Sequence, residues 1–151
     1  MIDGVKIKPV KVVPDERGRL MEIFRADDEF FTKFGQVYAT TTYPGVIKAW
    51  HKHERQADNM ACVAGMVKVA LYDGRPGSPT FREINEFYMG VHNPVLIHIP
   101  AGVHHGWMCV SRDEAIVVNA PTEMYDPKNP DEQRADPHGG EIPYDWRRKD
   151  K

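Results

Sequence analysis

The sequence predicts an all-β protein, a sandwich or barrel built from many short strands. Three observations support this prediction. Short apolar and β-branched runs recur along most of the chain, 12 glycines and 12 prolines supply turns between them, and only one segment has a helical pattern. Many short strands at nearly regular spacing are typical of sandwiches and barrels, and such a barrel can carry a ligand-sized mouth.

The expected strands are apolar or β-branched runs bounded by glycine, proline or polar turn residues. Residues 67–73 (VKVALYD) show the mixed alternation of a half-buried strand. In chain order, the expected strands are residues 5–13, 20–24, 37–42, 46–51, 60–72, 84–89, 95–99, 107–110 and 115–120.

One short helix is expected, at residues 27–34. Asp27 or Asp28 can serve as its N-cap, and Gly35 can end it. The chain of 151 residues is long enough to bury a core, and it contains no repeat, low-complexity tract or linker. We therefore expect residues 1–151 to form a single domain.

The character of the sequence changes after Pro121, where it becomes polar and rich in proline. Free linkers rarely carry aromatic residues, but this segment contains Tyr144 and Trp146. We therefore expect an irregular C-terminal tail that covers part of the fold and is anchored by these two side chains.

Composition excludes several classes of partner. The 20 Lys and Arg residues nearly balance the 22 Asp and Glu residues, and no basic patch stands out, so no nucleic acid is expected. No apolar run approaches the roughly 20 residues of a membrane span, and the N-terminus lacks the apolar core of a secretory signal. Cys62 and Cys109 lie in apolar runs without metal-like spacing, which indicates buried thiols in a reducing cytoplasm.

A cluster of histidines is the strongest functional signal. His51 and His53 stand two residues apart in a strand-like segment, and residues i and i+2 of a strand point to the same face. A second segment, residues 100–106 (PAGVHHG), turns at its Pro-x-Gly and introduces His105. Together with Asp58, these segments could place three imidazoles and a carboxylate in one cavity.

Both segments resemble the motifs of the cupin family. Residues 45–65 resemble G-x5-H-x-H-x4-E-x6-G, with Asp58 where the family usually has Glu, and residues 100–105 resemble P-x-G-x2-H. The resemblance implies a double-stranded β-helix, or jelly roll.

Within cupins, the chain is similar to the dTDP-4-dehydrorhamnose 3,5-epimerase family. The likeness covers about residues 5–146. Members act on nucleotide-linked 4-keto-6-deoxy sugars, so the resemblance implies an isomerase that works through an enolate in deoxysugar and cell-surface polysaccharide biosynthesis. The matching segments are residues 15–22 (DERGRLME), 45–51 (GVIKAWH), 73–81 (DGRPGSPTF), 99–107 (IPAGVHHGW) and 125–127 (YDP).

Epimerisation beside a ketone needs a base that removes a C–H proton, stabilisation of the enolate, and an acid on the other face. The resemblance assigns the base to His51, whose imidazole has an unperturbed pKa of about 6.5. It assigns the acid to Tyr125. Lys48 stands where the family carries arginine, and it would neutralise the oxyanion or bind phosphate.

The other expected site residues bind the substrate. Arg17 and Glu22 resemble positions that hold the nucleotide diphosphate and the base or sugar, and a guanidinium can grip phosphate through two parallel hydrogen bonds. His105 would hydrogen-bond the sugar or the enolate, and His53 replaces the family's usual glutamine. The resemblance implies a nucleotide-sugar partner, no cofactor or metal, and a homodimer that exchanges N-terminal strands such as residues 5–13.

The chain also departs from the family pattern. The family usually has a lysine and an arginine in the strand after the catalytic histidine, whereas the aligned residues are 58–61 (DNMA). It also orients that histidine with an aspartate from a C-terminal extension, and the sequence up to Lys151 offers no match. Asp58 or Asp73 could take this role.

Three alternatives stand beside the epimerase hypothesis. The His-x-His pair resembles the sugar-nucleotide 3,4-ketoisomerases, cupins that act on the same 4-keto sugars. A metal-dependent cupin would use His51, His53, Asp58 and His105, three histidines and an acid. A noncatalytic sugar-nucleotide-binding cupin would explain the missing lysine and the missing aspartate.

Overall fold

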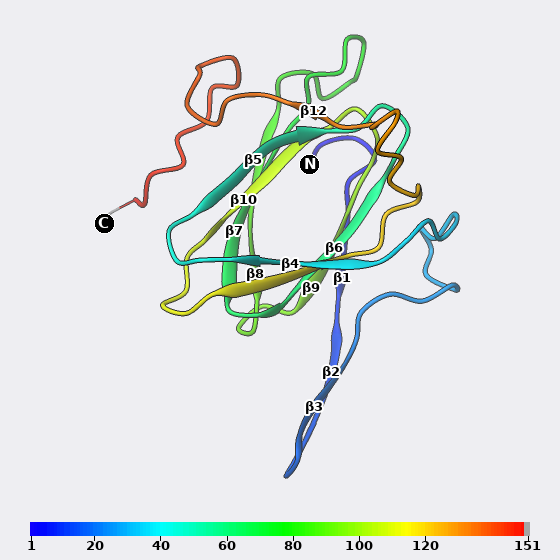
Figure 1. Ribbon diagram of the computed structural model, residues 1–151, viewed down its shortest axis with the longest axis vertical. Coiled ribbons are helices and arrows are strands. Elements are labelled where there is room, and N and C mark those ends of the chain that lie inside the picture. The colour runs from blue at the N-terminus through cyan, green and yellow to red at the C-terminus, as the bar shows by residue number, and fades with distance from the viewer. Residues whose placement is uncertain (150–151) are drawn as a thin grey trace.

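Two five-stranded antiparallel sheets face each other and form a flattened barrel (Figure 1). The computed structural model describes residues 1–149. The first sheet has the strand order β1-β9-β6-β11-β4, and the second has the order β12-β5-β10-β7-β8. A separate hairpin, β2-β3, extends away from the barrel (Figure 1). The predicted all-β jelly-roll architecture is confirmed.

The observed strands follow the predicted runs closely, apart from the two runs that divide. Their bounds are β1 Lys6–Pro9, β2 Lys11–Asp15, β3 Gly18–Glu22, β4 Tyr38–Thr42, β5 Ile47–Lys52, β6 Asp58–Ala64, β7 Met66–Tyr72, β8 Ile84–Gly90, β9 Val95–Ile99, β10 His104–Cys109, β11 Ala115–Asn119 and β12 Gln133–Arg134.

The core lies between the sheets. Met60 and Cys62 point into it from β6, and Val67, Val69 and Leu71 point into it from β7. These residues are two apart because side chains alternate along a strand, and each is 1 % exposed or less. Burial of a valine, leucine or methionine side chain contributes about 1.5–3 kcal/mol, so this alternation stabilises the face-to-face arrangement.

Two of the predicted strands are divided. The run at residues 5–13 breaks at Val10, where β1 leaves the first sheet and β2 begins the hairpin with β3. The run at residues 60–72 breaks at Gly65, which has a φ of +68°. A Cβ at Gly65 would lie 2.9 Å from the Cα of Ala115, so this turn between β6 and β7 requires glycine.

The helix predicted at residues 27–34 is wrong: the described part of the chain contains no helix, and therefore none that could cross a membrane. Asp28 instead organises a turn. Its carboxylate accepts a hydrogen bond from the Arg25 backbone N–H at 2.9 Å and pairs with Lys8 of β1, and its carbonyl accepts one from Phe31 N at 2.9 Å. A short carboxylate that binds nearby backbone donors competes with helix formation.

The C-terminal tail covers the outer face of the second sheet, as predicted. Trp146 is 2 % exposed, and its ring centroid lies 5.0 Å from that of Trp50 on β5 and 4.8 Å from that of Tyr144. Lys68 of β7 donates from Nζ to the Trp146 carbonyl at 2.8 Å. The tail also adds β12 beside β5, which places the residues around β12 at the mouth of the barrel.

Candidate active site

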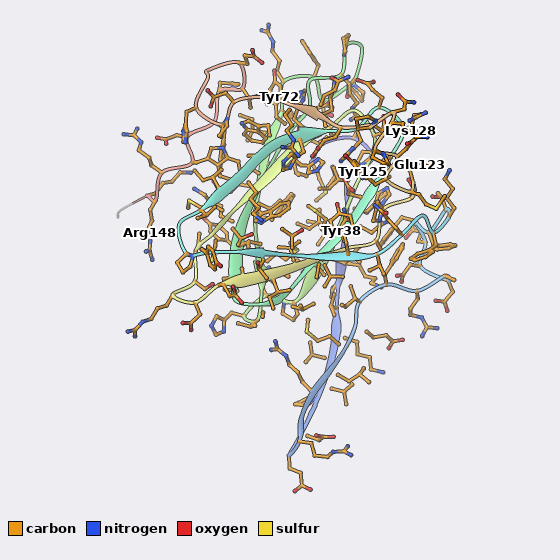
Figure 2. The ribbon with its side chains drawn as sticks, viewed as in Figure 1. Tyr38, Tyr72, Glu123, Tyr125, Lys128 and Arg148 are labelled. Carbon is orange, nitrogen blue, oxygen red and sulfur yellow. The ribbon has the colours of Figure 1, made fainter. Side chains whose placement is uncertain are left out.

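A cavity of about 460 Å³ opens at the mouth of the barrel. Its walls come from β4, β5, β6, β10 and β11 and from the tail around β12. Figure 2 labels two of the lining residues, Tyr38 on β4 and Tyr125 after β11. Five of the expected site residues line this cavity: Lys48, His51, His53, His105 and Tyr125.

Lys48 and His51 both face the cavity although they are three residues apart on β5. His105 pairs with His51 and Trp107 pairs with Lys48, so β5 has one more residue than β10 between these two pairs. Such a β-bulge places residues three apart on the same side of a strand. Gly106 permits this close crossing, because a Cβ there would lie 2.3 Å from the Cβ of Ala49.

His51 lies beside a carboxylate. Its Nε2 is 3.8 Å from Oε1 of Glu132, the residue that precedes β12, and Arg134 donates to the same carboxylate at 2.8 Å. Burial, followed by the neighbouring His105, lowers the pKa of His51 to about 4, whereas Glu132 acts in the opposite direction. At neutral pH the ring is therefore an uncharged imidazole, the form that accepts a proton.

The two aspartates considered as partners of His51 serve other contacts. Asp58 faces the other two cavity histidines. Asp73 is 0 % exposed and holds the turn after β7, where hydrogen bonds from Arg75 and then from the hydroxyls of Ser78 and Thr80 keep the pKa of its carboxyl well below the usual range. The family-like segment at residues 73–81 is thus a structural turn, and the carboxylate beside His51 is that of Glu132.

His53, Asp58 and His105 converge at the floor of the cavity. Asp58 Oδ2 lies 3.5 Å from His53 Nε2 and 3.3 Å from His105 Nε2. Both Nδ1 atoms contact backbone carbonyl oxygens, at 2.7 and 3.2 Å. Burial lowers the pKa of His105. The His51 ring centroid lies 6.0 Å from that of His105, so three of the four alternative metal ligands come together and His51 lies outside the group.

A network of amides fixes the Asp58 carboxylate, which is 1 % exposed. Its Oδ1 accepts hydrogen bonds from Gln56 Nε2 at 2.8 Å and from Asn119 Nδ2 at 2.7 Å. The Asn119 amide has a defined orientation, because its Oδ1 accepts the backbone N–H of Asn59 at 3.0 Å. Asn119 Nδ2 also contacts the Tyr38 hydroxyl at 2.9 Å, which leaves the phenolic proton free to point into the cavity.

Tyr125 and Lys48 lie nearer to the rim. The Tyr125 side chain is 62 % exposed and reaches the cavity from the segment that follows β11. Lys48 Nζ donates to the Thr41 carbonyl at 2.7 Å, so the ammonium stays within reach of the opening. A hydroxyl and a cation are thus available at the rim to a substrate that enters the mouth.

Arg17 and Glu22 do not reach the cavity of their own chain. Both lie on the extended hairpin, Arg17 at its turn and Glu22 at the end of β3. The Arg17 side chain is 85 % exposed and pairs with Asp15 at 2.5 Å, and Glu22 pairs with Arg25.

Several cavity residues were not predicted. Tyr38 and Asn119 occupy inward positions of β4 and β11, and nothing in their local sequence distinguishes them from core residues. Glu132 and Arg134 lie in a polar, proline-rich stretch, where no local signal marks them as site residues. The lining residues that the sequence did not single out include Tyr38, Gln56, Asn119, Glu132 and Arg134.

Comparisons with known proteins identify the family. The family model for dTDP-4-dehydrorhamnose 3,5-epimerase matches residues 1–151. A probable low-salt glycan biosynthesis epimerase of Haloferax volcanii is 40 % identical over 146 residues, which are 95 % of this chain and 89 % of the relative.

Two solved structures support this relationship. A dTDP sugar isomerase from Desulfovibrio desulfuricans superposes with a TM-score of 0.91 at 28 % identity, covering 96 % of this chain and 92 % of the other. A dTDP-6-deoxy-D-glucose-3,5-epimerase from Legionella pneumophila, in complex with dTDP-4-keto-L-rhamnose, gives a TM-score of 0.84 at 28 % identity, covering 96 % and 79 %. The chain therefore belongs to the dTDP-4-dehydrorhamnose 3,5-epimerase family.

Proposed function

We propose that the protein epimerises a nucleotide-linked 4-keto-6-deoxy sugar of the dTDP-4-dehydrorhamnose type, in the biosynthesis of a cell-surface polysaccharide. Family membership supports the reaction class, and the ligand of the Legionella enzyme supports the substrate class. The Haloferax relative, a probable glycan biosynthesis epimerase, supports the pathway. The observation that carries the proposal is the uncharged His51 imidazole on the cavity wall beside Glu132.

Each cavity residue has a role in this reaction. His51 removes the proton from a carbon next to the keto group, and Glu132 stabilises the imidazolium that results. Lys48 supplies a positive charge to the enolate or to the phosphates. Tyr125 donates a proton to the opposite face of the sugar and recovers it from solvent through its exposed side.

We also propose a homodimer in which the β2-β3 hairpin of one copy reaches the cavity of the other. The hairpin extends away from its own barrel (Figure 1) and carries Val13 and Leu20, which are 48 % and 62 % exposed. Exposed apolar strands of this kind are usually covered by a partner. In such a dimer Arg17 and Glu22 would bind the nucleotide of the neighbouring site.

A cytoplasmic location completes the proposal. Cys62 and Cys109 are both buried and free. Burial raises the pKa of the Cys62 thiol to about 11, so this thiol stays protonated at neutral pH. Two unpaired thiols inside the core are typical of a protein that folds in a reducing compartment.

Solvent isotope exchange tests the reaction. Each epimerisation in D2O replaces a carbon-bound hydrogen with deuterium, so incubation with dTDP-4-keto-6-deoxyglucose should place deuterium at C3, C5 or both, as read by NMR. His51→Asn should slow the exchange by about 10²–10⁴-fold, the usual contribution of a general base. His138→Gln, in the exposed part of the tail, is the matched control and should exchange at the normal rate.

Three results would contradict the epimerase proposal. Exchange that survives His51→Asn unchanged would remove His51 as the base. Binding of the nucleotide sugar without exchange would indicate a noncatalytic cupin. A 3-keto product would indicate a ketoisomerase.

A further inference from the structure

We infer that His53, Asp58 and His105 form a binding site for one divalent transition-metal ion, of the zinc class, at the floor of the cavity. The site itself follows from the geometry of these three side chains, whereas its chemical role rests on the proposed epimerase reaction. It differs from the four-residue set considered from the sequence, because His51 is not a member.

The tautomers of both histidines can be read from their partners. His53 Nδ1 lies 2.7 Å from the Asp131 carbonyl oxygen, and His105 Nδ1 lies 3.2 Å from the Val103 carbonyl oxygen. A carbonyl oxygen can only accept a hydrogen bond, so each Nδ1 carries a proton. In an uncharged ring the Nε2 atom then presents a lone pair, which is the form in which histidine binds a metal.

When both rings are uncharged, three acceptor atoms face one another. The two Nε2 lone pairs point toward Asp58 Oδ2, at 3.5 Å from His53 and 3.3 Å from His105. Acceptors that face each other without a proton or cation between them repel. A divalent cation between the three atoms would turn this repulsion into coordination, and two imidazoles with one carboxylate are ligands that zinc and its neighbours take.

The distances suit such an ion. Zinc bonds to nitrogen and oxygen are about 2.0–2.2 Å long, so ligand atoms around a tetrahedral ion lie about 3.3–3.6 Å apart. The two separations that involve Asp58 already have this length. All three ligand atoms lie within 4.8 Å of one another. A small rotation of the two imidazole rings would therefore bring the two histidine nitrogens to the same separation.

The surroundings are built to hold these ligands in place. Asp58 Oδ1 is occupied by the amides of Gln56 and Asn119, at 2.8 and 2.7 Å, which directs Oδ2 at the two rings. Hydrogen bonds that fix a ligand in this way are the usual outer layer of a metal site. His53 and His105 also line the cavity, so a fourth coordination position would open toward the substrate.

The ion would also change the charge at the floor of the cavity. The Asp58 carboxylate is 1 % exposed and faces His53 and His105, which both line the cavity, and by itself it would repel the negative charge that develops on the substrate. A bound divalent ion would reverse this charge and stabilise the keto oxygen as it becomes negative. His51, outside the ligand set, would remain free as the base.

Metal titration in the absence of sugar tests the site. Untagged protein, prepared without metal-affinity resin and stripped with a chelator, is titrated with Zn²⁺ by calorimetry and with Co²⁺ by visible absorption. We expect one equivalent of each ion and a Co²⁺ d–d spectrum of low-symmetry nitrogen and oxygen coordination. Asp58→Asn and His53→Ala should each weaken metal binding by at least about 100-fold. Loss of a residue that only hydrogen-bonds a ligand typically costs about 10- to 100-fold in metal affinity, so the larger effect identifies a direct ligand.

His104→Gln is the matched control, because His104 neighbours a ligand on β10 but lies outside the ligand set. It should bind one equivalent with unchanged affinity. Near-ultraviolet circular dichroism establishes that each variant is folded, and Asp58→Asn preserves side-chain size if His53→Ala does not fold. Substoichiometric or only millimolar binding by the wild type, or binding that survives Asp58→Asn, would overturn the inference.

This result is separable from the proposed function. Deuterium exchange by a protein that binds no metal would remove the ion and leave the epimerase reaction intact. Stoichiometric metal binding by a protein that exchanges no deuterium would support the metal site and contradict the epimerase reaction.

Discussion

Lys48 and His51 face the same cavity across a β-bulge whose opposite strand carries Gly106. In a regular strand these two side chains would point to opposite faces. The bulge therefore brings the only lysine of the cavity wall within the described chain to the same substrate as the proposed base.

Gly106→Ala tests this arrangement. The added methyl group would lie 2.3 Å from the Cβ of Ala49 and 2.8 Å from its Cα, so β5 and β10 must move apart. Overpacking of this kind costs about 1–3 kcal/mol, and we expect the free energy of unfolding in urea to fall by that amount. The exchange rate should fall at least about tenfold, since both Lys48 and His51 shift. The double variant Gly106→Ala/Ala49→Gly removes the opposing Cβ, so it should recover part of the loss in stability and part of the loss in exchange rate. A Gly106→Ala protein of normal stability would refute the close crossing.

Glu132→Gln tests the carboxylate beside His51. The substitution preserves size but removes the charge that stabilises the imidazolium at 3.8 Å. We expect kcat to fall by about 10- to 100-fold, equivalent to about 1.4–2.7 kcal/mol, with little change in KM. Stability should change by less than about 1 kcal/mol, because the Arg134 partner of the ion pair is 73 % exposed and the pair is screened by solvent. Glu141→Gln, in the exposed tail, should behave as wild type, and an unchanged kcat in Glu132→Gln would exclude this role.

The sequence predicted the parts of the site that depend on local spacing. His51 and His53 were expected on one side of a strand, and the Pro-x-Gly turn was expected to bring His105 to them. All three line one cavity, because a two-residue period and a tight turn are local properties of the chain. The anchoring of the tail by Tyr144 and Trp146 was predicted correctly for a similar reason, since aromatic residues in a polar stretch need an apolar surface to cover.

The sequence could not show features that depend on distant partners. The meeting of Glu132 with His51 requires β12 to pair with β5, about 80 residues earlier in the chain, and the bulge at Lys48 is visible only in the ladder with β10. Strand β7 was expected to be half-buried but is covered on both faces, with Lys68 only 3 % exposed, because the tail lies over it. The expected helix failed in the same way, since Asp28 pairs with Lys8 of β1.

Asp73→Asn tests the buried turn after β7. Hydrogen bonds from Arg75, Ser78 and Thr80 keep the pKa of Asp73 below its unfolded value of about 3.9. A group with a lowered folded pKa stabilises the protein above the unfolded pKa, and this contribution is lost as the pH falls below it. We expect Asp73→Asn to lose about 2–4 kcal/mol of unfolding free energy at pH 6, because it removes one partner of a buried ion pair.

The difference between Asp73→Asn and wild type should shrink when urea unfolding is repeated at pH 4 and then at pH 3, since protonation of Asp73 in the unfolded chain reduces the wild-type advantage. Asp113→Asn, on an exposed loop, should track wild type at every pH. A difference that stays constant from pH 6 to pH 3 would show that the charge of Asp73 contributes nothing.

Mixed dimers test whether Arg17 serves the neighbouring site. Arg17 lies on a hairpin outside its own cavity, with an 85 % exposed side chain, so we expect Arg17→Ala to raise KM for the nucleotide sugar about tenfold or more while stability stays unchanged.

His51→Asn inactivates the cavity of its own chain. If the hairpin acts across the dimer, a mixed dimer of the two variants contains one cavity with both His51 and the partner's intact Arg17. Co-expression with two different tags and purification through both should then restore roughly half of the wild-type activity with a normal KM. A mixed dimer no more active than the mean of the two parent variants, or a wild-type protein that stays monomeric at every concentration in light scattering, would show that the hairpin does not complete a second copy's site.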